Sequence, residues 1–126
     1  MRVRSTTRPV ALAAVLAGGV CLAAGAAKPD AAAGKAVYDR DCASCHGATG
    51  KGDGDDAAYF TNKPPNFTDP AVLSKRSDDF LAAVITGGGP AKGLSKDMPA
   101  TKLSAGDVKS VVAYLRQLSG RAKSGK

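Results

Sequence analysis

Cys42-Ala43-Ser44-Cys45-His46 is the stretch around which the rest of this 126-residue chain is organised. It has the form C-x-x-C-H, the pattern at which a c-type haem is attached. Residues three apart on a helix share a face, so Cys42 and Cys45 can both reach the two vinyl-derived positions of one porphyrin. His46 follows directly and is the only histidine of the chain, which makes it the candidate proximal ligand of the iron. The motif therefore predicts one covalently bound haem c.

Three other interpretations of the motif are less favoured. A structural zinc site needs four sulfur or nitrogen ligands, and outside the N-terminal leader the chain offers only Cys42, Cys45 and His46. A thioredoxin-like redox pair occurs near a βαβ pattern, and this sequence shows none. The last interpretation is two buried cysteines beside a surface histidine. A candidate second iron ligand farther along the chain favours the haem interpretation over this last one.

The composition is that of one small domain with a thin core. Aromatic residues make up 5% of the chain, tryptophan is absent, and the 44% hydrophobic share relies on alanine. A buried haem would supply much of the missing apolar area, at about 25 cal/mol for each Å² removed from water.

Residues 1–26 have the composition of a secretory signal peptide. Three arginines in the first eight residues precede an uncharged run at 9–27, and an A-x-A cleavage site lies at 24–26. We expect cleavage there and export to the periplasm, leaving a domain at 27–126. An uncleaved leader is the alternative, because 19 residues can span a membrane and would anchor the protein. A lipid anchor on Cys21 is less favoured, since a valine precedes it where a small residue is expected.

The charge of the chain argues against a nucleic-acid binder. The full sequence carries +7, and removal of the leader deletes three arginines and no acidic residue, which leaves +4. This excess of positive charge is mild, and the sequence shows no basic helix face with interleaved aromatic residues of the kind that binds nucleic acid.

Four helical segments and no strands are predicted, which gives an all-α fold. The first is capped by Asp30 and runs through Cys45, with Gly34 placed to allow close approach of another backbone. Cap and stop signals define the other three. They are a short turn from Asp69-Pro70 to about Lys75, a helix from Ser77-Asp78 to the Gly87-Gly88-Gly89-Pro90 stop, and a helix after Ser104 with Val108, Val111, Val112, Leu115 and Leu118 on one face.

The connecting loops contain one further candidate ligand. The glycine-rich stretch 47–56 fits neither an EF-hand nor a phosphate-binding loop, and we interpret it as a solvated turn. The loop from Pro90 to Leu103 contains Met98-Pro99, and Met98 is the only methionine outside the leader. A lone methionine is usually core filler. A haem iron with one histidine ligand needs either a sixth ligand or an open coordination position, so Met98 is the candidate sixth ligand.

Taken together, these features resemble the class I c-type cytochromes. The resemblance rests on C-x-x-C-H, on Met98-Pro99 and on the closing Val112-Ala113-Tyr114-Leu115-Arg116, and it spans a core of about 30–118. It implies a small cytochrome c fold of three to four helices around one haem, with a flexible basic tail at 119–126. It also implies that the first and last helices cross. At this crossing, Gly34 and Tyr38 of the first helix would meet Val111 and Tyr114 of the last helix.

One departure from the family pattern concerns the orientation of His46. Many relatives have a proline soon after the glycine loop, and its carbonyl holds the proximal imidazole. Asp55 and Asp56 occupy that region here, so the acceptor for His46 is an open question at this stage.

The expected function is electron transfer rather than catalysis. Cys42 and Cys45 would anchor the haem, and His46 and Met98 would be its axial ligands, which excludes O₂ chemistry and favours Fe(II). The expected partners are redox proteins, with an acidic docking face on an oxidase, reductase or dehydrogenase. The alternatives are a dedicated haem c subunit of a dehydrogenase or oxidase complex, and a five-coordinate haem ligand sensor or weak peroxidase in which Met98 dissociates.

Five lysines on loops or helix starts are candidates for electrostatic docking around the haem edge. The alternative is that they only solubilise the surface, because exposed charges contribute little individually. They are Lys51, Lys63, Lys92, Lys96 and Lys102.

Overall fold

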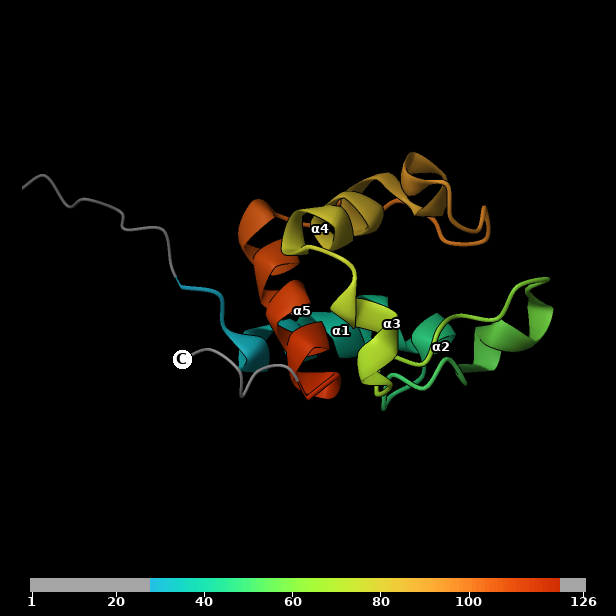
Figure 1. Cartoon of the computed structure of the whole chain (residues 1–126), viewed down its shortest axis with the longest axis horizontal. Helices are drawn as coiled ribbons and strands as arrows, with labels where there is room; N and C mark the ends of the chain where they lie inside the picture. The colour runs from blue at the N-terminus through green and yellow to red at the C-terminus, as the bar shows by residue number, and fades with distance from the viewer. Residues whose placement is uncertain (1–27, 121–126) are drawn as a thin grey trace, which may run out of the picture.

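Helices form all the regular secondary structure in residues 28–120, the part of the chain that the computed structural model describes. The predicted all-α class is confirmed (Figure 1). The predicted leader and residues 121–126 of the predicted tail lie outside the described residues. The α-helices are α1 (Ala31–Asp41), α2 (Ala43–His46), α3 (Pro70–Ser74), α4 (Asp78–Gly87) and α5 (Ala105–Leu118), and the 3₁₀ turns are η1 (Asp55–Tyr59) and η2 (Gly89–Lys92).

The predicted continuous helix through Cys45 is wrong, because the backbone breaks at Cys42. The predicted cap at Asp30 is present, since its carboxylate accepts from the Ala32 amide at 2.9 Å. At Cys42, however, φ is −123°, far from the helical value of about −63°. The buried Tyr38 hydroxyl donates to the Gly47 carbonyl at 2.8 Å, which fixes the end of α2 against α1. The break accounts for five helices where four were expected.

The crossing of α1 and α5 has the partners that the family resemblance implied. Gly34 lies so close to α5 that a Cβ on it would collide with the Ser110 carbonyl and lie 2.9 Å from the Val111 amide nitrogen. The Tyr38 and Tyr114 rings meet edge to face, with centroids 5.1 Å apart. Helix α1 ends at the C-x-x-C-H motif, so this contact sets where the motif lies relative to α5.

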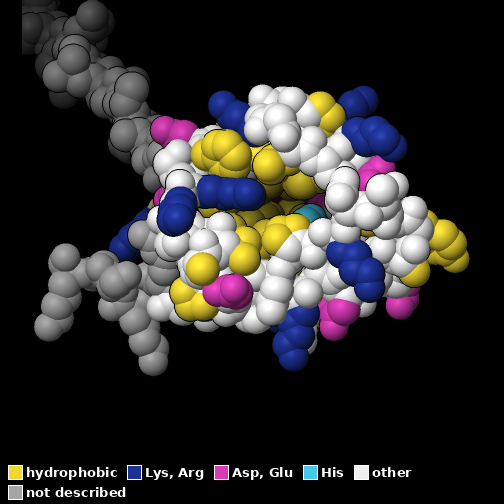
Figure 2. Space-filling model, turned by 45° about the vertical axis from the view of Figure 1, so that its right-hand side comes forward, with side chains coloured by type: hydrophobic (Ala, Val, Ile, Leu, Met, Phe, Trp, Pro, Cys, Tyr) yellow, Lys and Arg dark blue, Asp and Glu magenta, His cyan; other side chains and the backbone are white. Residues whose placement is uncertain are grey.

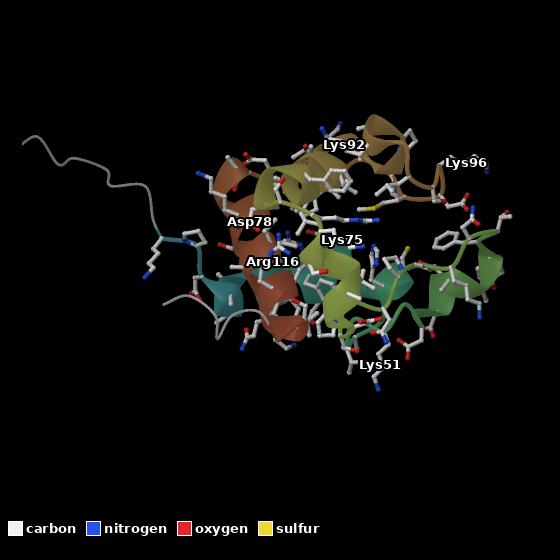
Figure 3. The ribbon with its side chains drawn as sticks, viewed as in Figure 1. Lys51, Lys75, Asp78, Lys92, Lys96 and Arg116 are labelled. Carbon is white, nitrogen blue, oxygen red and sulfur yellow. The ribbon has the colours of Figure 1, made fainter. Side chains whose placement is uncertain are left out.

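Arg116 of α5 joins the last helix to the α3–α4 connection. Its side chain is only 15% exposed and forms an ion pair with Asp78 at the start of α4. It also donates to the carbonyls of Leu73 and Arg76, at 2.8 and 2.5 Å. Figure 3 shows Arg116 and Asp78 side by side at this junction. The side chain therefore joins α5 to the end of α3 and to the turn that precedes α4.

Side-chain caps begin three of the helices. Asp69, Ser77 and Ser104 cap α3, α4 and α5, as predicted. The Ser104 hydroxyl accepts from the Asp107 amide at 3.1 Å and donates to the Asp107 carboxylate at 2.8 Å. Ser119, the first residue of the predicted tail, is buried at the end of α5 and belongs to the fold.

The elements form two groups that face each other across an opening. In Figure 1, α4, η2 and the loop after them lie above, while α2, η1 and the chain following η1 lie below. Helix α5 contacts both α1 and α4, and so joins the two groups. No helix in residues 28–120 has the length and apolar character needed to cross a membrane.

Candidate functional site

A cleft of about 320 Å³ lies between the two groups of elements. Cys42, Cys45, His46 and Met98 all line it, although the methionine is more than fifty residues from the motif. Figure 2 looks into the cleft and shows the histidine inside it, apolar side chains around it and lysine or arginine side chains near its edge. The fold thus brings together the four residues that the sequence singled out.

Cys42 joins α1 to α2, and Cys45 lies within α2. Both side chains are half-buried, and they form no disulfide with each other. Burial, with smaller contributions from Asp41 and Cys45, raises the pKa of the Cys42 thiol to about 11. The amides of Cys45 and His46 both donate to the Cys42 carbonyl, at 3.2 and 2.9 Å. One helical turn therefore places the three side chains along the cleft.

His46 lines the cleft and is half-buried. Its Nδ1 is buried without a hydrogen-bond partner in residues 28–120. The ring stacks on Phe67, with centroids 4.8 Å apart and an interplanar angle of 25°. Burial lowers the pKa of His46 to about 4, so the imidazole is neutral at physiological pH. A neutral imidazole with an accessible nitrogen is the form that ligates a metal.

No group within residues 28–120 accepts a hydrogen bond from the Nδ1 atom of His46. Neither Asp55 nor Asp56 accepts a hydrogen bond from Nδ1, although η1 begins at this position. The Phe67 amide donates to the Gly50 carbonyl at 2.7 Å, and this bond holds Phe67 beside the C-x-x-C-H motif. In the described chain, an aromatic stack rather than a carbonyl therefore orients the imidazole.

Backbone contacts with the end of α4 hold the Met98 loop. The Gly89 amide donates to the Met98 carbonyl at 3.0 Å. Gly88 has φ +76°, and a Cβ there would lie 2.9 Å from the same carbonyl, so glycine serves both the turn and the close approach. Thr101 donates to the Ile85 carbonyl through its amide at 3.0 Å and its hydroxyl at 2.8 Å. These bonds fix both sides of the methionine.

The walls of the cleft are mainly apolar. Of the apolar residues there other than Pro99, the sequence singled out only Leu115, as part of one face of the last helix, and did not place it at this site. The apolar and aromatic side chains lining the cleft are Phe60, Pro64, Pro65, Phe67, Leu81, Val84, Ile85, Leu94, Pro99 and Leu115.

A match to a known family decides between the interpretations of this site. The cytochrome c family model matches residues 31–119, which includes every residue of the site. The chain belongs to the cytochrome c family. Members of this family carry covalently bound haem c and act in electron transfer, so the chain is a haem c electron-transfer protein. None of the curated proteins compared with the chain matches it.

The residues of this cytochrome c domain fit such a cofactor. Haem c needs an apolar cleft, two thiols three residues apart and an imidazole that lines the cleft, and each of these is present. Within residues 28–120, no group of three or more His, Cys, Asp or Glu side chains is arranged to hold a bare metal ion.

Proposed function

We propose that the protein is a monohaem c-type cytochrome that carries single electrons between redox partners in the periplasm. Cys42 and Cys45 form the two thioether bonds, and His46 and Met98 are the axial ligands. The observation that supports this assignment is the single cleft lined by all four side chains. The haem supplies one-electron chemistry as its iron alternates between Fe(II) and Fe(III).

The chain's own residues tune and protect this chemistry. A histidine–methionine pair favours the ferrous state and raises the reduction potential. The apolar walls act in the same direction, because a low-dielectric environment disfavours the extra charge of the ferric state. If His46 and Met98 both bind the iron, they would leave no position for O₂ or a substrate. The buried α1–α5 contact would hold the haem-binding motif in place.

Covalent attachment through both cysteines is the first consequence to test. The haem colour should stay with the protein in acidified acetone, and the mass should exceed that of the polypeptide by one haem. Cys42→Ser and Cys45→Ser should each retain one thioether, and the double variant should release its haem on extraction. Ser44→Ala, which alters the same turn but leaves both cysteines in place, is the matched control. Complete extraction of haem from the unmodified protein would contradict the assignment.

Docking by lysines at the cleft edge is a second consequence. Lys63 lines the cleft and is exposed, and Lys92 is exposed on η2. Lys96 is a weaker candidate for docking than the sequence suggested, because its ammonium group pairs with the Asp97 carboxylate at 3.3 Å. If Lys63 and Lys92 steer an acidic partner, electron transfer should slow as salt rises, because the Debye length falls from about 30 Å at 0.01 M to about 10 Å at 0.1 M.

Charge reversal separates local docking from net charge. Figure 3 places Lys51 at the opposite edge of the molecule from Lys92, so Lys51→Glu is the matched control. Lys63→Glu and Lys92→Glu should lower the association rate severalfold more than this control. Equal effects from all three would mean that only net charge matters, and a rate independent of salt would remove the electrostatic explanation.

A further inference from the structure

The carboxylate of Asp56 lies beside one of the two cysteines of the C-x-x-C-H motif. Its Oδ2 atom is 4.0 Å from the Sγ atom of Cys45, although the two residues are 11 positions apart. Asp56 is exposed and forms no ion pair within residues 28–120. Asp55, the preceding residue of η1, is also exposed but makes no hydrogen bond with either cysteine. Of the two negative charges that begin η1, the one on Asp56 therefore contacts the motif.

Backbone packing between η1 and α2 holds Asp56 in this place. The Gly52 amide donates to the His46 carbonyl at 2.8 Å, so the glycine loop returns to the end of α2. Gly54, which precedes η1, lies so close to α2 that a Cβ on it would collide with the Ser44 carbonyl oxygen. Figure 1 shows this turn beside α2. Because backbone atoms make these contacts, the position of residue 56 does not depend on the charge of its side chain.

A negative charge at this position would act on the redox equilibrium of a haem attached to Cys45. Attachment turns the thiol into a thioether, which has no proton to share with the carboxylate. No lysine or arginine within residues 28–120 pairs with Asp56, so only solvent compensates its charge. By Coulomb's law, the charge stabilises Fe(III), the more positive state, relative to Fe(II). The carboxylate would therefore act against the Met98 thioether and the apolar walls, which both favour Fe(II).

We propose that Asp56 is a potential-setting residue, whose charge beside Cys45 lowers the reduction potential of the haem. The proposal rests on the proposed function, because it requires a haem that is attached to Cys45. The exposure of the carboxylate limits the size of the effect, since charges in contact with water interact weakly. We expect the carboxylate to shift the ferric-to-ferrous equilibrium about two- to threefold toward Fe(III).

Asp56→Asn in the haem-loaded protein tests this role, with Asp55→Asn as the matched control. Both substitutions remove one negative charge from η1 and keep the shape of the side chain, but only residue 56 contacts Cys45. The midpoint potential of Asp56→Asn should rise by about 18–28 mV, which is the two- to threefold change converted at 59 mV per tenfold change for one electron. Asp55→Asn should raise the potential by less than half as much. Equal rises would mean that only the net charge of the turn matters, and would overturn the role of Asp56.

Salt dependence provides a readout that a purely structural role would not change. The Debye length falls from about 30 Å at 0.01 M to about 3 Å at 1 M. The difference in potential between Asp56→Asn and the unmodified protein should therefore shrink as salt rises. Asp56→Glu keeps the charge and should have a potential closer to that of the unmodified protein than Asp56→Asn has. A difference that is independent of salt, or a glutamate variant that matches the asparagine variant, would overturn the electrostatic role.

Spectra and haem content separate the failure of this proposal from the failure of the proposed function. The visible spectra of both oxidation states should be the same in all the variants, because none of the substitutions replaces an axial ligand. A changed spectrum together with a changed potential would indicate altered coordination and would overturn the role of charge. Covalent haem content is measured on the same samples. Its absence from the unmodified protein would overturn the proposed function itself, whereas an unchanged or lowered potential of Asp56→Asn with haem in place would overturn only the role of Asp56.

Discussion

Replacement of Met98 by alanine should abolish the weak sulfur-to-iron absorption band at the near-infrared edge of the oxidised protein. It should also lower the reduction potential, because the thioether that favours Fe(II) is lost. Axial ligands span a potential range of about 0.8 V, and we expect a decrease of roughly 0.1 V or more. The reduced variant should bind carbon monoxide, since the sixth position would be open. Visible and near-infrared spectra with a redox titration would measure all three effects.

Leu94→Ala is the matched control for this experiment. Leu94 lies in the same loop, is half-buried and lines the same cleft, but has no ligating atom. Its truncation should retain the band and leave carbon monoxide binding absent. Persistence of the band in Met98→Ala would rule out the assignment. Rapid carbon monoxide binding by the unmodified protein would instead favour the five-coordinate sensor.

The loop geometry extends this prediction to a residue that does not face the cofactor. Gly88 has a left-handed backbone and lies against the Met98 carbonyl. Alanine at this position must both strain the turn and displace the loop. The thioether band should therefore weaken in Gly88→Ala even though Met98 is unchanged.

Local signals explain which parts of the fold were predictable. The caps at Asp30, Ser77 and Ser104 are side chains that bond to amides two or three residues away, so the sequence alone contains the whole interaction. The glycine and proline stop after α4 is equally local. The break at Cys42 is not, because both flanking segments have helical patterns. It accompanies the bond between the Tyr38 hydroxyl and the Gly47 carbonyl, which no periodicity reveals.

The residues of the candidate site also divide into those that the local sequence identifies and those that only the fold reveals. The motif spacing identified Cys42, Cys45 and His46, and the scarcity of methionine identified Met98. Phe67 was missed as a neighbour of His46, because the contact joins residues 21 positions apart through the fold of the glycine loop.

Replacing Gly34 with alanine should destabilise the protein by about 2 kcal/mol or more. Two effects of opposite sign act here. Alanine favours a helix interior over glycine by roughly 0.5–1 kcal/mol. The new methyl group, however, would overlap the Ser110 carbonyl, which is backbone and cannot rotate away. The helices must then separate at their crossing and disturb Val111, which is 1% exposed, and the Tyr38–Tyr114 contact. We expect the steric effect to be the larger one.

Gly106→Ala provides the control that isolates the helix-propensity effect. Gly106 lies in the first turn of α5, and a Cβ there would meet only the Ser104 hydroxyl, at 3.8 Å. This variant should be unchanged or slightly more stable. Thermal unfolding of the haem-loaded variants measures both changes, and a 2 kcal/mol loss corresponds to a decrease in Tm of roughly 8–16 °C for a domain of this size. If Gly34→Ala were as stable as Gly106→Ala, the close crossing of α1 and α5 would be wrong, and with it the reason why the haem-binding motif at the end of α1 keeps its place beside α5.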